Sequence, residues 1–132
     1  MDYKIENIEE RGERPEQVLS CLRKSDLGDE GEFGQIYVIH IKPGAVKGNH
    51  YHAKKREWLV CLQGKVEVTL KDRESGEEKV EVLDADDSEV KRLYIPPGLA
   101  HCVEAKSPAI LLEYSSTEFN PEDDDYIKFN IK

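Results

Sequence analysis

The chain has 132 residues, of which 38% are hydrophobic and 36% are charged, and its formal net charge is −9. This length and this balance predict one folded domain with a heavily solvated surface rather than a disordered chain. The negative charge would repel phosphate backbones and anionic lipids, so binding to nucleic acid or to a membrane surface is not expected.

Residues 1–32 are expected to form an extension before the main fold. The chain opens with Met1 and polar residues, without the apolar core of a signal peptide, and no apolar run reaches the ~20 residues needed to cross a bilayer. We therefore expect a cytoplasmic protein. Within the extension, Val18, Leu19 and Leu22 would share one helical face, with Pro15 in the first turn, so a short helix is expected there.

From Phe33 onward, short runs of alternating or clustered apolar residues predict strands, and turn residues separate the runs. The expected strands are Gln35–Ile41, Trp58–Leu62, Lys65–Leu70, Lys79–Leu83, Arg92–Ile95 and Ala109–Tyr114. Many strands without helices between them favour an all-β sandwich or barrel over an α/β fold. Ser75-Gly76 predicts a hairpin turn, and residues 126–132 could add an edge strand.

No internal repeat or Pro/Gly-rich linker divides the sequence, so residues 1–132 predict a single domain. Its barrel core is expected to span about 33–117, between the N-terminal extension 1–32 and a C-terminal tail 118–132. A domain of this length can bury a core without disulfides or metal clips.

Four residues have the spacing of metal ligands. His50 and His52 stand two apart, so in a strand both side chains project to one face, ~7 Å apart along the backbone. Glu57 follows a four-residue connection and can present a carboxylate from the start of the next strand. Pro96-Pro97-Gly98 predicts a rigid turn that directs His101 into the same cavity. We therefore expect His50, His52, Glu57 and His101 to bind one divalent metal ion.

Three imidazoles and one carboxylate suit Fe(II), Mn(II), Co(II), Ni(II), Cu(II) or Zn(II), and they leave one or two positions open for water or substrate. Ligand softness does not choose among these metals. Isolated His-x-His pairs also occur on solvated strands that bind nothing. Here the pair is accompanied by Glu57, Gly64 and the element 96–101, which favours a metal site.

Two segments, Gly44…His50-x-His52-x4-Glu57-x6-Gly64 and Pro96-x-Gly98-x2-His101, resemble the paired signature motifs of the cupin superfamily. The first motif matches at every defining position. The second has Val90 where glycine is common and Ala105 where asparagine is common. The resemblance implies a double-stranded β-helix, the cupin jelly-roll barrel, with a metal at its centre.

Further segments resemble the sugar-nucleotide cupins, typified by dTDP-4-dehydrorhamnose 3,5-epimerase, and the sugar 3,4-ketoisomerases are similar too. These segments are Phe33–Tyr37, Pro43–His52, Ile95–Gly98 and Phe119–Asp123. In that epimerase family the histidine at the position of His50 abstracts a proton beside a ketone, and a basic residue at the position of Lys47 contacts diphosphate. The family works without a metal and has a catalytic tyrosine where Phe119 stands, so this chain departs from it twice.

A histidine bound to metal cannot also act as a free base, so His50 has one role or the other, and we favour metal binding. Tyr37 and Glu113 are then candidates for proton transfer, although Tyr37 could pack in its strand and Glu113 could orient a metal-bound histidine. Candidates for substrate binding are Lys47, Arg56 and Tyr114. A solvated loop is the alternative for the two cations, and strand packing is the alternative for the tyrosine.

Three hypotheses for the function follow from these residues. The first is a metal-dependent isomerase or epimerase that acts on a keto sugar or a sugar nucleotide. The second is an Fe(II)- or Ni(II)-dependent dioxygenase of a small metabolite. The third is a protein that binds a sugar or small metabolite without turnover. Because cupins pair through barrel edges and residues 1–32 could add a strand to a neighbour, we also expect a homodimer.

Overall fold

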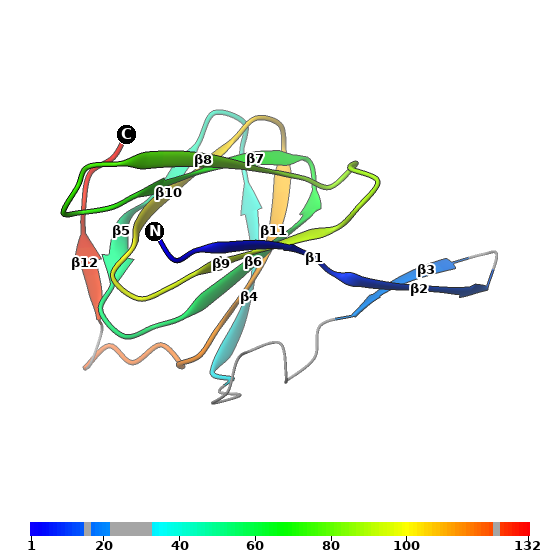
Figure 1. Ribbon diagram of the computed structural model, residues 1–132, viewed down its shortest axis with the longest axis horizontal. Helices are drawn as coiled ribbons and strands as arrows, with labels where there is room; N and C mark the ends of the chain where they lie inside the picture. The colour runs from blue at the N-terminus through cyan, green and yellow to red at the C-terminus, as the bar shows by residue number, and fades with distance from the viewer. Residues whose placement is uncertain (15–16, 22–32, 123–124) are drawn as a thin grey trace.

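The alternating runs of the sequence form two five-stranded antiparallel sheets in this computed structural model, and the sheets enclose a jelly-roll barrel (Figure 1). The structure describes residues 1–14, 17–21, 33–122 and 125–132, with the backbone alone for 9–14 and 17–21. Every regular element in these ranges is a strand, so the expected all-β cupin jelly roll is confirmed. None of these ranges contains a helix long and apolar enough to span a membrane.

The strand order shows how distant segments are brought together in the two sheets. The first sheet contains, in order, β1 (Lys4–Asn7), β9 (Lys91–Ile95), β6 (Glu57–Gln63), β11 (Ala109–Ser115) and β4 (Gln35–Ile41). The second contains, in order, β12 (Tyr126–Lys128), β5 (Val46–His52), β10 (Ala100–Ala105), β7 (Lys65–Lys71) and β8 (Glu78–Asp84). The expected hairpin around Ser75-Gly76 is confirmed, because β7 and β8 pair along their whole length.

The core lies between the two sheets and follows from strand alternation. Val66, Val68 and Leu70 are every second residue of β7, and all three are fully buried there. Leu59 and Cys61 have the parity of Glu57 and point into the same core. Truncation of one such large side chain to alanine costs ~2–5 kcal/mol, so these positions hold the barrel together.

The opposite parity of β6 places Trp58 outside the main core. Its ring stacks on Tyr114 of β11 with ring centroids 5.2 Å apart, and it contacts Tyr94 of β9 at 5.1 Å. Trp58 and Tyr114 are both buried in this smaller outer cluster. The first sheet is therefore packed on both of its faces at this point.

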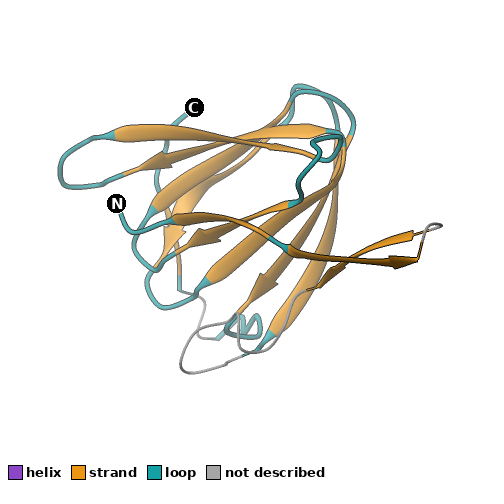
Figure 2. Ribbon diagram, turned by 45° about the vertical axis from the view of Figure 1, so that its right-hand side comes forward, coloured by secondary structure: helices purple, strands orange, loops and turns teal. Residues whose placement is uncertain are grey.

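The short helix expected in the N-terminal extension is wrong over its described part. Residues 17–21 form strand β3 (Gln17–Cys21), which pairs with β2 (Glu9–Arg14) in a two-stranded hairpin. Five residues are too few to show a helical period that would distinguish them from a strand, and pairing with β2 decides the conformation. Figure 2 shows that this hairpin projects away from the barrel. Pro15 and Leu22 lie outside the described residues.

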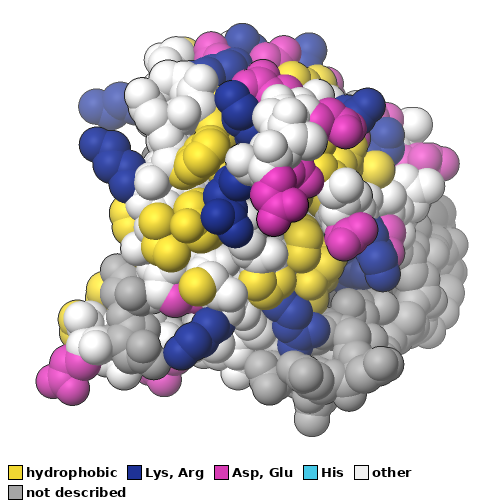
Figure 3. Space-filling model, turned by 60° about the vertical axis from the view of Figure 1, so that its left-hand side comes forward, with side chains coloured by type: hydrophobic (Ala, Val, Ile, Leu, Met, Phe, Trp, Pro, Cys, Tyr) yellow, Lys and Arg dark blue, Asp and Glu magenta, His cyan; other side chains and the backbone are white. Residues whose placement is uncertain are grey.

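One face of the molecule mixes both signs of charge. On the face drawn in Figure 3, lysine and arginine side chains are interspersed with acidic and apolar ones. No broad basic area on this face would attract an anionic ligand from a distance.

Candidate functional site

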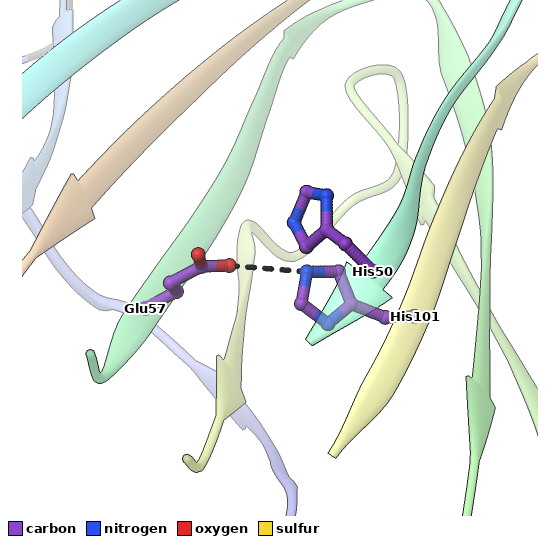
Figure 4. A group of neighbouring side chains, drawn as sticks. All are labelled: His50, Glu57 and His101. Atoms are coloured by element: carbon purple, nitrogen blue, oxygen red, sulfur yellow. Dashed lines mark ion pairs between the residues drawn. The ribbon is translucent and has the colours of Figure 1, made fainter. Parts of the chain in front are cut away.

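Three strands bring the histidines and Glu57 together inside the barrel. His50 and His52 lie on β5 with their ring centroids 4.8 Å apart. His101 lies on the neighbouring strand β10, directly opposite His50 in register, and these two rings are 4.7 Å apart. Glu57 is the first residue of β6 in the other sheet and extends its carboxylate toward the histidines (Figure 4). The sequence spacing thus predicted a real spatial cluster.

The Glu57 carboxylate lies between two of the rings. Its Oε1 is 2.8 Å from Nε2 of His52, and its Oε2 is 3.2 Å from Nε2 of His101. Glu57 is only 2% exposed. Burial alone would raise the pKa of this carboxyl, but the hydrogen bonds from His101 and His52 outweigh it, so the pKa lies well below its ordinary value. Glu57 is therefore a buried carboxylate anion.

His52 and His101, the two rings beside the Glu57 carboxylate, use their Nδ1 atoms as hydrogen-bond donors. Nδ1 of His101 is 3.0 Å from the carbonyl oxygen of Leu99, and Nδ1 of His52 is 3.0 Å from Oδ1 of Asp125. A carbonyl or carboxylate oxygen can only accept, so in a neutral ring each Nε2 presents a lone pair to a Glu57 oxygen. Lone pairs that face each other at these distances need a shared cation, which is a proton or a metal ion.

His50 supplies a further nitrogen donor. Its Nδ1 is buried and has no hydrogen-bond partner in the structure. Burial first, and then the charge of His101, lower the pKa of His50 to about 4, so its ring is neutral at neutral pH. A neutral imidazole is the form that binds a metal ion.

The arrangement fits a divalent transition metal. One ligand atom each from His50, Glu57 and His101 lies within 4.8 Å of the others, and imidazole nitrogen with carboxylate oxygen is a common donor set for such metals. His52, the fourth predicted ligand, reaches the same carboxylate through Nε2. Metal-bound histidines usually donate their other ring N–H to a carboxylate or carbonyl, and Nδ1 of His52 has such a partner in Asp125. The role of His52 as a ligand stays a prediction.

Asp125 is a supporting residue that the sequence analysis missed. Besides His52, its carboxylate accepts hydrogen bonds from the backbone N–H groups of Lys54 at 2.7 Å and Lys55 at 2.8 Å. Burial would raise the pKa of Asp125, but these bonds and the one from His52 keep it below its ordinary value. Asp125 is the last of a run of acidic residues in the sequence and lies 73 residues from His52, so no spacing motif indicated this contact.

A pocket of about 190 Å³ opens beside the cluster, and both sheets contribute to its walls. Glu113 of β11 lines it with a side chain that is 12% exposed, and its Oε2 is 3.9 Å from Nζ of Lys47. Burial first, and then the charge of Glu57, raise the pKa of Glu113 to about 7. Tyr37 of β4 is the cross-strand neighbour of Glu113 and also lines the pocket. These three predicted residues do come together.

Two predicted substrate-binding residues do not line this pocket. Tyr114 follows Glu113 in β11, so strand alternation turns it to the other side, where it stacks on Trp58. The Arg56 guanidinium lies over the Trp58 ring, 5.4 Å from its centroid. Both residues therefore belong to the outer cluster. The pocket is also lined by Phe119 and Tyr126, which were not among the predicted site residues.

Comparison with known proteins gives one matching family model and several relatives. The model is described as the polysaccharide biosynthesis C-terminal domain and matches residues 25–127. Mannose-1-phosphate guanylyltransferase ManC of Salmonella typhimurium is 34% identical over 110 residues, which is 82% of this chain and 21% of that protein. The corresponding enzyme of Salmonella montevideo is 32% identical over 131 residues, 98% of this chain and 25% of that protein. The chain thus spans about a quarter or less of these relatives.

Solved structures share the fold over most of the chain. A 3,4-ketoisomerase from Helicobacter canadensis matches with a TM-score of 0.82 and 25% identity, covering 97% of this chain and 91% of that one. QdtA, a sugar 3,4-ketoisomerase from Thermoanaerobacterium thermosaccharolyticum in complex with TDP, matches with a TM-score of 0.80 and 23% identity, covering 96% and 88%. CapF from Staphylococcus aureus, a capsular polysaccharide assembling protein, has a TM-score of 0.71 and 24% identity, covering 76% and 27%. The resemblance to sugar-nucleotide cupins is confirmed.

Proposed function

Because the chain belongs to the polysaccharide biosynthesis C-terminal domain family, we propose that it is a metal-binding isomerase or epimerase of a keto sugar or sugar nucleotide. One observation carries the proposal. A pocket of about 190 Å³ contains both the donor cluster of His50, Glu57 and His101 and the buried carboxyl group of Glu113, which lies beside Lys47. The 3,4-ketoisomerases that share the fold act on sugars of this kind by their own descriptions.

Isomerisation beside a ketone requires a group that takes and returns a proton. Glu113 fits this role, because proton transfer is most effective when the pKa of the group lies near the working pH. Lys47 lies 3.9 Å from the Glu113 carboxylate and would stabilise its ionised form. A divalent metal held by His50, Glu57 and His101, with His52 as the fourth ligand, would act as a Lewis acid toward a substrate carbonyl.

The activity can be tested by proton exchange. We expect the protein, loaded with a divalent metal in D₂O, to place deuterium on carbons beside the keto group of TDP-4-keto-6-deoxyglucose, the sugar bound by a QdtA variant. Nuclear magnetic resonance of the recovered sugar would measure it. Absence of exchange with this sugar and with free keto sugars would overturn the proposal, and oxygen consumption by the Fe(II)-loaded protein would favour the dioxygenase instead.

The metal site has its own test. We expect one divalent ion per chain in protein purified without a chelating resin, measured by elemental analysis. Glu57→Gln should lower this content at least tenfold, because the amide leaves the buried imidazoles without a shared anion.

Glu104→Gln is the matched control for the metal site. Glu104 is a carboxylate of β10 that pairs with lysines outside the pocket, so its loss should leave the metal content unchanged. Equal metal content in the Glu57→Gln and Glu104→Gln variants would contradict the assignment of Glu57 as a ligand.

A further inference from the structure

The carboxylate of Asp125 occupies an anion site in the connection between β5 and β6. Its Oδ2 accepts hydrogen bonds from two consecutive backbone N–H groups, those of Lys54 at 2.7 Å and Lys55 at 2.8 Å. Successive N–H groups that converge on one point form an anion-binding concavity, and phosphate groups are frequent occupants of such concavities. The chain's own carboxylate therefore fills a site that also suits a phosphate oxygen.

Two pockets adjoin at this place. The pocket beside the histidine cluster and a second pocket of about 160 Å³ share Lys55 and Phe119 as lining residues. Asp125 lines the second pocket, and the next residue, Tyr126, lines the first. The first pocket, at about 190 Å³, is smaller than the roughly 300–1,000 Å³ that ligand sites usually offer. An outward movement of Asp125 and Tyr126 would join the two pockets into a cleft within that range.

The charges around the anion site favour an anionic ligand once Asp125 leaves. Lys54 and Lys55 both line the second pocket, and lysine is a common phosphate binder because its charge is compact. Glu118 is the other acidic residue among the described lining residues of this pocket. Two lysines and one carboxylate then give the second pocket a net positive charge.

The element that carries Asp125 can move without disturbing the barrel. Asp125 directly precedes β12, a strand of three exposed residues that pairs with β5 at the end of its sheet. The other four strands of this sheet pair with one another in the order β5, β10, β7 and β8. Elements with few buried contacts open at a low free-energy cost. Displacement of Asp125 is therefore a local event.

We propose that Asp125 is an internal competitor for a phosphate group of the substrate, which displaces it from the N–H groups of Lys54 and Lys55. This inference rests on the proposed function and narrows its substrate to a sugar that carries phosphate. An internal carboxylate has a high effective concentration, so a free phosphate ion displaces it poorly. A ligand that also fills the joined pockets supplies the additional binding energy. The contact thus selects ligands that have both parts.

Asp125→Ala tests the inference because it empties the anion site. We expect the metal-free variant to bind TDP, the ligand of one QdtA structure, about tenfold more tightly than the metal-free wild type in calorimetry. Thymidine, which has no phosphate, should bind both proteins equally. Glu122→Ala is the matched control, because it removes an exposed negative charge near Asp125 and should leave TDP affinity within about twofold.

Hydrogen exchange in the wild-type protein gives a second test that needs no variant. If TDP displaces Asp125, saturation with TDP should accelerate exchange of the β12 amides about tenfold, while the β7 amides keep their protection. Slower or unchanged exchange in β12 would overturn the inference.

The outcomes with the variant are equally decisive. Unchanged or weaker TDP binding by Asp125→Ala would show that Asp125 only supports the site, and an equal gain for thymidine would show that the substitution only widens the pocket. Absence of TDP binding by both proteins would also overturn the inference. Deuterium incorporation into free keto sugars would then still decide the proposed function separately.

Discussion

Glu113 shows how one buried side chain links stability to pH. Its pKa is about 7 in the folded protein, raised by burial and by Glu57, against 4.5 for the free group. A raised pKa means that the folded state holds the proton more tightly than the unfolded state. The stabilising contribution is therefore complete below pH 4.5 and is lost as the pH rises through 7.

Glu113→Gln should make this dependence visible. The amide cannot ionise, so the stability of the variant relative to the wild type should increase between pH 4.5 and 7 and then level off. Urea unfolding of metal-free protein at several pH values would measure it. Glu104→Gln serves as a control, because lysine contacts lower the pKa of Glu104 and no such rise is expected in this range. A constant difference for Glu113→Gln would contradict the assignment.

At the residue scale, the sequence predicted what lies in short motifs and missed what the fold adds. His50 and His52 stand two apart in one strand, so strand geometry alone places their side chains on the same face, and Glu57 follows them after a short connection. Asp125 and Tyr126 reach the site only because β12 pairs with β5, a contact across more than 70 residues. An acidic turn and an aromatic residue near the C-terminus are too common to indicate a site.

At the element scale, Asn49 attaches the C-terminal segment to β5. It has a positive φ of 55°, and its Oδ1 accepts hydrogen bonds from the N–H groups of Ile131 at 2.9 Å and Lys132 at 3.0 Å. Its Nδ2 donates to the carbonyl of Lys132 at 3.0 Å. Asn49 lies at the register shift of β5 against β10, where His101 pairs with His50 and Cys102 pairs with Gly48. Asparagine tolerates this left-handed conformation better than most residues, so one residue serves both the bulge and the attachment.

Asn49→Gly should loosen the C-terminal segment without straining the bulge in β5. Glycine adopts a positive φ freely but makes none of the three side-chain bonds, so stability should fall by about 1–2 kcal/mol. Amide hydrogen exchange should accelerate at least tenfold in residues 126–132 while the β7 amides keep their protection. Asn49→Asp is the matched control, because it keeps the acceptor oxygen. Full protection of the segment in Asn49→Gly would show that the β12 pairing alone holds it.

The elements that sequence patterns predicted are those with one buried face. β7 and β11 were expected within one residue of their observed ends, since apolar residues mark their inward side. All four residues of β1 are exposed, so no alternation revealed this strand. The prediction of a helix in the N-terminal extension was wrong for a related reason. A segment as short as 17–21 takes its conformation from the strand with which it pairs.

At the scale of the whole molecule, one edge of the barrel exposes apolar side chains. β4 is the last strand of the first sheet, and its outward residues Ile36 and Val38 are 53% and 59% exposed. Open apolar edges of this kind are usually covered, since they otherwise pair with other chains. The β2–β3 hairpin projects from the barrel as a segment able to cover such an edge (Figure 1). A second copy of the chain would provide that hairpin, which supports the homodimer predicted from the sequence.

Val38→Lys should convert the expected dimer to a monomer. We expect light scattering to give the wild-type protein about twice the 15.1-kDa mass of the chain, and the variant a mass near that of one chain. A lysine at the centre of the interface would have to lose its hydration without a partner, which opposes association. Val80→Lys is the matched control, because Val80 is 54% exposed on β8, the last strand of the other sheet. A monomeric wild-type protein would refute the dimer, and a monomer only in Val80→Lys would place the interface on the second sheet.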